Sequence, residues 1–278
     1  MVNCNRFFAF GCSFTSYVWP TWADIIGHNF KSKFYNYGKG GSGNFQMLER
    51  LMQVDQLYNI NEKDLVVICW TNVTREDRWI KGRWETGGNV YTNHFYDKNF
   101  TEKYCDPLGY YIKDLAIIKI VTEFLKSRGC TFYMLSLNPL DKFEQWGEER
   151  NLYYNNEAKT NYKNIYNNVA DGYKNITEQI KSSYYEIIYK KNWKYKHDNN
   201  IKSPLIKYKD KIVLDYHPTP IEHLRYLEAV LPEFIVSEEI RQLVNKSDEI
   251  VLKKPYTEYG DMDVWFDNTY TDKVRELY

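Results

Sequence analysis

Residues 64–70 read DLVVICW, a nearly continuous apolar run with polar residues on both sides. A run of this length without polar alternation is typical of a parallel strand that is buried on both faces. Shorter apolar runs predict four further strands, at residues 6–11 (RFFAFG), 33–37 (KFYNY), 130–137 (CTFYMLSL) and 211–215 (KIVLD). We therefore predict a sheet of five strands.

Segments with apolar residues at helical spacing separate these strands. We predict helices over residues 21–30, 44–57 and 110–126, and a last helix from Pro220 onward. Ser42 or Asn44 is the expected cap of the second helix, and residues 219–222 form a capping box with proline at the first helical position. Strands and helices that alternate with long crossovers predict an α/β fold with a mostly parallel sheet.

The length of 278 residues suits one large domain with insertions. We predict one domain over residues 1–237. Within it, residues 79–108 form a long loop, because they contain glycines and aromatic residues with little periodicity. Residues 140–210 form an aromatic-rich insertion, and residues 238–278 form a C-terminal tail.

Composition argues against several classes of function. The 37 basic and 37 acidic residues cancel, so no charge pattern indicates nucleic-acid binding. The five cysteines include no CxxC pair, and the five histidines show no metal-ligand spacing, so we expect no disulfide framework, no metal and no cofactor. No apolar run of about 18 residues predicts a membrane span. The N-terminus lacks a secretory signal pattern, so we expect a cytoplasmic or virion-associated protein with no membrane partner.

Polar residues gather at the ends of four predicted strands. They are Gly11-Cys12-Ser13, residues 38–44 (GKGGSGN), residues 70–75 (WTNVTR) and Asp215-Tyr216-His217. Ligands of open parallel sheets bind beyond the carboxyl ends of the strands. We therefore expect these four groups to form one site.

Two of these strand ends suggest nucleophilic catalysis. A serine hydroxyl needs a base within hydrogen-bond reach, and His217 is the one histidine that directly follows a predicted core strand. Asp215, two residues earlier, is placed to orient the imidazole. Cys12 stands beside Ser13 as a second potential nucleophile, and the strand pattern alone does not decide which side chain faces the site.

The other two strand ends offer hydrogen-bond donors. The stretch NYGKGGSGN lacks the Lys-Ser/Thr pair that follows the last glycine of a phosphate loop, so it is not one. Its glycines let the backbone approach a ligand closely. The side-chain amide of Asn72 could donate to an oxyanion. Taken singly, a turn glycine and a capping asparagine explain these residues equally well.

Together the four blocks resemble the SGNH/GDSL hydrolase superfamily, which is named for a serine, a glycine, an asparagine and a histidine in that chain order. Ser13 in FGCSFT matches the first block, Gly41 in NYGKGG the second, Asn72 the third and His217 in DYHP the last. The resemblance covers residues 6–230 without the predicted loop and insertion. The FGCSFT and D-x-HP variants are similar to those of little-studied members, many of them encoded by tailed phages.

The sequence departs from the family pattern in three respects. Cys12 stands where the family commonly has aspartate, and Trp70 and Val73 replace the usual glycine and aspartate around the asparagine. Asp215 precedes His217 by two positions, whereas many members space them by three. The last departure leaves open which aspartate orients the histidine.

The resemblance implies a flavodoxin-like three-layer α/β/α sandwich with a mostly parallel five-stranded sheet. It also implies that Ser13 is the nucleophile, His217 the base and Asp215 its acid, and that Ser13, Gly41 and Asn72 form an oxyanion hole. The implied function is a serine esterase or deacetylase acting on a small ester or an O-acetyl group, for instance on a glycan. An acyltransferase would use the same residues. The alternative is a non-catalytic structural or binding protein, such as a virion component, that keeps this fold.

Other residues are candidates for contacts with a substrate or partner. Cys12 and Arg75 lie next to the implied catalytic residues, and Arg75 pairs either with an acidic substrate or with a neighbouring carboxylate. The aromatic residues of the insertion form either a wall for sugar rings or a surface for a partner subunit or virion component. They are Tyr153, Tyr154, Tyr162, Tyr166, Trp193 and Tyr195.

Overall fold

The computed structural model describes residues 4–30, 32–92, 96–140, 156–208, 211–253 and 255–257. Its centre is a parallel sheet in the order β2-β1-β3-β6. The strands are β1 (Arg6–Phe10), β2 (Lys33–Asn36), β3 (Asp64–Trp70) and β6 (Thr131–Ser136). All seven residues of β3 are buried, as its unbroken apolar sequence predicts.

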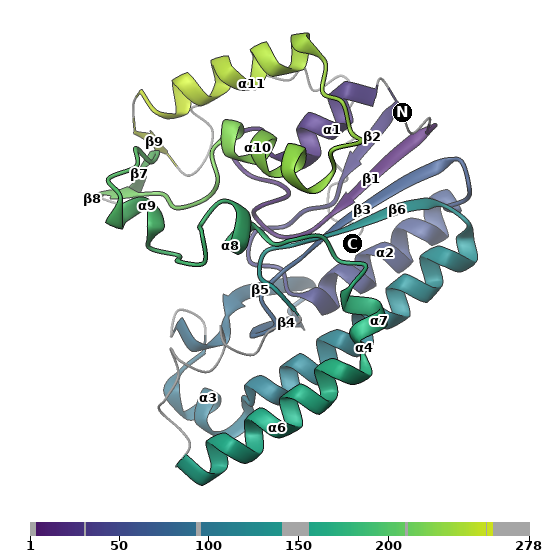
Figure 1. Ribbon diagram of the computed structural model, residues 1–278, viewed down its shortest axis with the longest axis vertical. Helices are drawn as coiled ribbons and strands as arrows, with labels where there is room; N and C mark the ends of the chain where they lie inside the picture. The colour runs from purple at the N-terminus through teal and green to yellow at the C-terminus, as the bar shows by residue number, and fades with distance from the viewer. Residues whose placement is uncertain are drawn as a thin grey trace.

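Helices cover both faces of this sheet (Figure 1). One layer holds α1 (Trp22–Phe30), α10 (Pro220–Val230) and α11 (Glu238–Val251), which contact one another. The other layer holds α2 (Asn44–Tyr58) and α4 (Pro107–Arg128), and α6 (Asn156–Gly172) runs along α4 (Figure 1). The predicted three-layer α/β/α architecture is therefore confirmed.

The sheet and its helices share one apolar core. Neighbouring aromatic rings of β1 and β2 stack on each other, with centroid separations of 5.0 Å for Phe7–Phe34 and for Phe8–Tyr35. Leu51 on α2 and Leu115 on α4 are fully buried against the same sheet. None of the described helices is long and apolar enough to cross a membrane.

The predicted fifth strand does not join the central sheet, which has four strands in the described part of the chain. Residues 211–214 form β8 (Lys211–Leu214), which pairs antiparallel with β7 (Leu205–Tyr208) in a separate small sheet. A short parallel strand, β9 (Tyr256–Thr257), completes that sheet. All four residues of β8 are exposed. The run KIVL is too short to show whether its strand lies inside a sheet or at an edge. The run also does not show which strand it pairs with.

Residues 79–108 are not the predicted long loop. They contain most of a hairpin of β4 (Arg75–Ile80) and β5 (Arg83–Asn89), then a short 3-10 helix η1 (Val90–Thr92) and α3 (Lys98–Tyr104). The two-residue turn has positive φ at Lys81 (51°) and Gly82 (82°), which is the conformation of a type I′ hairpin turn. The Lys-Gly pair between two short runs was the available signal for this hairpin.

The predicted insertion and tail contain further helices. Described residues of 140–210 form α6, α7 (Lys174–Thr177), α8 (Tyr184–Ile187) and α9 (Tyr195–Asp198). Residues 238–251, for which the sequence suggested no regular structure, form α11. Ser237 caps this helix, and its Ile240 and Val244 join the core.

Leu51 and Leu57 test how much the α2 packing stabilises the fold. Leu51 is fully buried, whereas Leu57 on the same helix is 58% exposed. Leu51→Ala should lower the free energy of unfolding by about 2–5 kcal/mol, because the substitution leaves a cavity. Leu57→Ala should change it by less than about 0.5 kcal/mol. Urea unfolding monitored by circular dichroism measures both, and equal effects would contradict this packing.

Candidate active site

Ser13, His217 and Asp215 form a continuous hydrogen-bonded chain. Ser13 Oγ lies 2.9 Å from His217 Nε2, and His217 Nδ1 lies 2.7 Å from Asp215 Oδ1. The His217 side chain is 29% exposed, whereas the Asp215 side chain is 5% exposed. The hydroxyl is therefore within reach of a base that meets solvent on one side and a buried carboxylate on the other.

The turn after β1 directs Ser13 and Cys12 to different environments. The turn is closed by hydrogen bonds from Thr15 N and Ser16 N to the Cys12 carbonyl. Cys12 is fully buried in the core, while Ser13 is partly exposed. The suggested substrate contact through Cys12 is therefore wrong, because its thiol does not reach the surface. Of the two potential nucleophiles, Ser13 is therefore the one with surface that a substrate can approach.

The loop that carries His217 is held through three successive carbonyl groups. Tyr189 Oη donates to the Tyr216 carbonyl at 2.5 Å, and Trp19 Nε1 donates to the Pro218 carbonyl at 2.8 Å. The carbonyl of His217 itself accepts from Lys196 Nζ at 3.2 Å. These three donor side chains are buried, so the loop is fixed by the protein interior rather than by its own short sequence.

Lys196 links this loop to the start of α10. Its side chain is 1% exposed, and its ammonium nitrogen lies 2.5 Å from a carboxylate oxygen of Glu222. The same Glu222 oxygen accepts from Thr219 N at 2.8 Å, which is the predicted capping box. Lys196 and Tyr189 both come from the 140–210 segment, so that segment supports the histidine loop.

Asp215 is set up to remain a carboxylate. Burial raises its pKa, but hydrogen bonds from the ring and backbone of His217 and from Tyr17 outweigh burial and bring the pKa below the ordinary value. The backbone bond runs from His217 N to Asp215 Oδ1 at 2.9 Å. The spacing of two residues thus permits one carboxylate oxygen to bind both the ring and the backbone of His217.

Tyr17 is a site residue that the sequence analysis missed. Its hydroxyl donates to Asp215 Oδ2, and its ring stacks on the His217 imidazole with centroids 4.0 Å apart and planes at 22°. Nothing in the local pattern FTSYVWP singles this tyrosine out. Its partners lie about two hundred residues further along the chain, so only the folded structure reveals the contact.

Gly41 lies in a loop that the hairpin covers. Its φ is 76°, and a Cβ there would lie 2.3 Å from the Thr86 carbonyl oxygen of β5. Its carbonyl accepts from Gly88 N at 3.2 Å. The Gly41 loop is tied to the Ser13 turn by the bond of Lys39 N to the Gly11 carbonyl at 3.0 Å. Glycine is therefore required here by both backbone conformation and close packing.

Asn72 is oriented with its amide nitrogen available. Its Oδ1 accepts from Thr74 N at 2.8 Å and from Thr74 Oγ1 at 2.6 Å. These two bonds fix the side chain and leave Nδ2 to donate elsewhere. The orientation suits an oxyanion donor at the end of β3, next to the Ser13 turn at the end of β1.

The amino end of α2 is capped by a side chain of the hairpin and not by a residue next to the helix in sequence. Neither Ser42 nor Asn44 caps the helix, and the N-cap residue is Gly43. Asp77 of β4 accepts instead from Gly43 N at 2.8 Å and from Gln46 N at 3.0 Å. A carboxylate at this end satisfies free N–H groups and complements the helix dipole. Asp77 thus ties the hairpin to the Gly41 loop.

Asn44 has a different function, which is to hold the end of β3. Its Oδ1 accepts from Thr71 N at 2.9 Å, and its Nδ2 donates to Asp114 Oδ2 at 2.7 Å. Asp114 on α4 is 2% exposed, and burial raises its pKa to about 8. The Asp114 carboxyl therefore holds Asn44, and Asn44 holds Thr71, the residue before Asn72.

Arg75 faces the Gly41 loop. Its Nη1 donates to the Ser42 carbonyl at 2.8 Å. Its positive charge also lies close enough to Asp77 to lower the pKa of that carboxyl, although burial raises that pKa more. The neighbouring-carboxylate alternative therefore has structural support, and contact of Arg75 with a substrate stays a prediction.

The aromatic residues of the insertion that the structure describes differ in burial. Tyr166 is 2% exposed and stacks on Tyr111 with centroids 4.2 Å apart. Trp193 packs against Tyr189 at 4.4 Å, and both Trp193 and Tyr195 are partly exposed. Tyr153, Tyr154 and the side chain of Tyr162 lie outside the described residues. The sugar wall and the partner surface therefore both stay predictions.

The remaining described histidines do not form a metal site. His223 is buried and bonded to Tyr184 Oη at 2.7 Å, and burial brings its pKa well below the ordinary value. No group of three or more His, Cys, Asp or Glu side chains within the described ranges is arranged to hold a metal ion.

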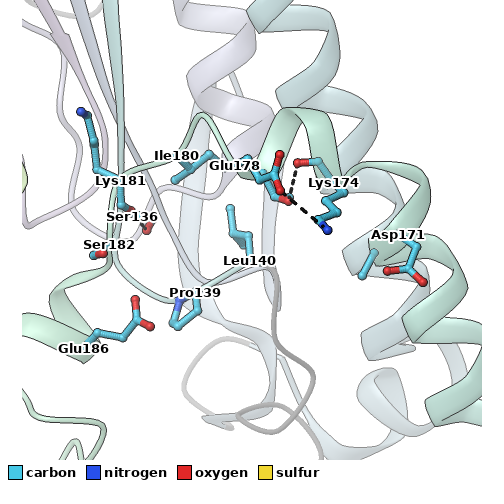
Figure 2. A pocket seen from close by; sticks show the side chains of 12 residues that line it. Ser136, Pro139, Leu140, Asp171, Lys174, Glu178, Ile180, Lys181, Ser182 and Glu186 are labelled. Carbon is cyan, nitrogen blue, oxygen red and sulfur yellow. Dashed lines mark hydrogen bonds and ion pairs between the residues drawn. The ribbon is translucent and has the colours of Figure 1, made fainter.

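A separate cavity of about 320 Å³ opens at the carboxyl end of β6 (Figure 2). Ser136, Leu140, Lys174, Glu178 and Lys181 are among its lining residues. Its lining includes none of the three residues of the Ser13–His217–Asp215 chain, so the cavity is not the site described above.

Comparisons with known proteins found similarity of structure only. No family model matches the chain, and no curated protein matches its sequence. A solved member of the lipolytic G-D-S-L family from Veillonella parvula is 12% identical, with 82% of this chain and 99% of that chain covered and a TM-score of 0.42. A catalytic mutant of Axe2, an acetylxylan esterase from Geobacillus stearothermophilus, is 14% identical, with 82% and 93% covered and a TM-score of 0.39. At these values, the chemistry of this chain has to be read from its own residues.

Asp114 predicts a pH-dependent stability. The folded state keeps its proton up to about pH 8, whereas the unfolded chain releases it near the ordinary aspartate pKa of 3.8. The folded state binds more protons between these values, so the stabilisation from this carboxyl is present at acidic pH and is lost as the pH rises towards 8. Asp114→Asn removes this dependence. The unfolding free energy of the variant should therefore rise relative to wild type by at most about 1.4 kcal/mol per pH unit.

Urea unfolding of both proteins at pH 5, 6.5 and 8 measures this difference. A constant gap between the two curves would show that Asp114 is ionised in the folded protein.

Proposed function

We propose that the protein is a serine-dependent ester hydrolase of the SGNH type. The observation that carries the proposal is the 2.9 Å hydrogen bond between Ser13 Oγ and His217 Nε2, with Asp215 on the other ring nitrogen. A nucleophile, a base and an orienting acid in this order are the groups that acyl transfer requires. Residues 204 positions apart in sequence meet to form the nucleophile–base pair.

The proposed reaction proceeds in two steps. Ser13 Oγ attacks the ester carbonyl carbon while His217 Nε2 takes the hydroxyl proton, and the carbonyl π electrons move to the oxygen. Collapse of this intermediate expels the alcohol, which takes the proton back from His217. Water then attacks the acyl-serine carbonyl carbon while His217 Nε2 takes a proton from the water. Collapse of this second intermediate breaks the bond to Ser13 Oγ, which takes that proton back from His217, and the carboxylic acid leaves.

The oxyanion of each intermediate would be held by Ser13 N, Gly41 N and Asn72 Nδ2. The Gly41 loop and the Ser13 turn are bonded to each other, and Asn44 holds the residue before Asn72. Donors that are fixed before the reaction stabilise the developing charge without a cost of reorganisation. This preorganisation is what the interlocked strand ends contribute.

The substrate we propose is a small ester or an O-acetyl group on a glycan. Phe45 and Trp79 expose 43% and 48% of their surface beside the hairpin and the Gly41 loop. Trp84 lies between their rings, at centroid distances of 6.0 and 5.7 Å. Aromatic faces next to polar groups suit sugar rings. Addition of a sugar acceptor separates hydrolysis from acyl transfer, because a transferase forms a new ester in preference to free acid.

Labelling with a fluorophosphonate tests the nucleophile directly. We expect the reagent to modify Ser13, as found by peptide mapping, and we expect Ser13→Ala to abolish both labelling and hydrolysis of a short-chain acyl ester. Cys12→Ala is the matched control and should keep both, because Cys12 is buried. Loss of labelling in the cysteine variant, or no labelling of the wild-type protein, would refute the proposal.

Asn72→Ala tests the oxyanion donor. The kcat should fall roughly 100- to 1000-fold, equal to about 3–4 kcal/mol of transition-state stabilisation, while KM changes little. Asn61→Ala is the control at the opposite end of β3, where Asn61 Oδ1 accepts from Lys63 N in the same kind of turn. Steady-state kinetics on one ester compares the two. A rise in KM at unchanged kcat for the Asn72 variant would exclude the oxyanion role.

A further inference from the structure

Tyr17 contacts two members of the hydrogen-bonded chain at once. Its hydroxyl donates to Asp215 Oδ2, the carboxylate oxygen that His217 does not use, and its ring lies flat on the imidazole. The ring of Phe14 also lies beside His217, but it is tilted by 58° at a centroid distance of 5.5 Å. Tyr17 therefore contacts both the acid and the base of the proposed reaction.

We infer that Tyr17 is a positioning residue for the proposed ester hydrolysis, in which its hydroxyl orients the Asp215 carboxylate and its ring seats the His217 imidazole against Ser13. The catalytic part of this inference rests on the proposed function. The two contacts of Tyr17, with Asp215 and with His217, are seen in the structure whether or not the protein hydrolyses esters.

The hydroxyl and the ring of Tyr17 act on different members of the hydrogen-bonded chain. The hydrogen bond from Tyr17 draws charge from Asp215 and contributes to the low pKa of that carboxyl. Without this bond, the carboxylate keeps more charge for the proton on His217 Nδ1. The negative face of the ring attracts the positive charge that the imidazole gains when it takes the Ser13 proton in the proposed reaction.

Tyr17 is itself held rigidly. Trp19 packs on its ring at a centroid distance of 4.7 Å and an angle of 78°. Val251 of α11 and Ile206 of β7 belong to the same apolar cluster. Trp19 also donates to the Pro218 carbonyl, so the histidine loop is bonded to Tyr17 at Asp215 and to Trp19 at Pro218. Helix α11 and the small sheet stabilise this arrangement through Val251 and Ile206.

Other titratable groups face this region and stay unchanged in the test. Lys196 bonds the His217 carbonyl and pairs with Glu222. The charge of His217 influences buried His223, and the charge of Asp215 influences buried Tyr189. Any change that follows a substitution of Tyr17 alone therefore reports on its own hydroxyl or ring.

The experiment compares Tyr17→Phe and Tyr17→Leu with wild type. The proton resonance of His217 Nδ1, assigned with a His217→Gln variant, is recorded by NMR, and kcat and KM for a short-chain ester are measured at the same pH. Tyr17→Phe should move this resonance downfield, because the Asp215 carboxylate then accepts one hydrogen bond fewer and binds the Nδ1 proton more strongly. Its kcat should fall roughly 10-fold at nearly constant KM.

Tyr17→Leu should lower kcat further than Tyr17→Phe, because the aromatic face that seats the imidazole is lost as well. Tyr189→Phe is the matched control, since it removes a hydroxyl bond to the Tyr216 carbonyl in the same loop. It should lower the melting temperature and leave the His217 Nδ1 resonance where it is in wild type. An equal change of that resonance in the Tyr189 variant, or no change in Tyr17→Phe, would overturn the inference.

Failure of the proposed function gives a different result. Wild-type protein that neither reacts with a fluorophosphonate nor hydrolyses esters would refute the hydrolase. The position of the His217 Nδ1 resonance in the Tyr17 variants would still decide whether Tyr17 positions Asp215 and His217.

Discussion

Burial of β3 on both faces is the constraint on which the rest of this structure depends. Because every residue of β3 is buried, β1 and β6 must pair with it on either side and helices must cover both faces. Parallel pairing then brings the carboxyl ends of the strands to one edge. The chain leaves that edge in loops that carry Ser13, Gly41 and Asn72. The Gly41 loop is bonded to the Ser13 turn, and Asn44, which follows the Gly41 loop, is bonded to the residue before Asn72.

The histidine reaches this edge by a different principle. The predicted strand before it does not belong to the central sheet, so no strand register fixes His217 in place. Buried side chains from distant segments do so through the carbonyl groups of its loop. The Lys196–Glu222 pair among them is costly to desolvate, and such a pair is retained only where its further hydrogen bonds are satisfied. Lys196 donates to the His217 carbonyl, and Glu222 accepts from Thr219 N. The hydrogen bonds that offset the burial of this ion pair therefore also hold His217 in place.

The hairpin of β4 and β5 acts as a third support. Asp77 caps α2 across the chain, and the backbone of β5 packs on Gly41 so closely that a side chain there is excluded. A two-stranded hairpin is marginal by itself. Its stability comes from the Trp79–Trp84 pair and from these contacts, so the hairpin and the proposed oxyanion loop order each other.

The sequence by itself determined the α/β class, the four central strands and the residues that meet at their ends, because continuous apolar runs and glycine or histidine at strand ends are local signals. It did not determine that KIVL pairs in a separate sheet, that residues 75–89 form a hairpin or that Cys12 points into the core. The contacts of Tyr17, Asp77 and Lys196 were equally invisible. Each of these contacts joins residues that are far apart in the chain. Hydrogen bonds and packing act only at short distances in space, and only the tertiary structure brings such residues together.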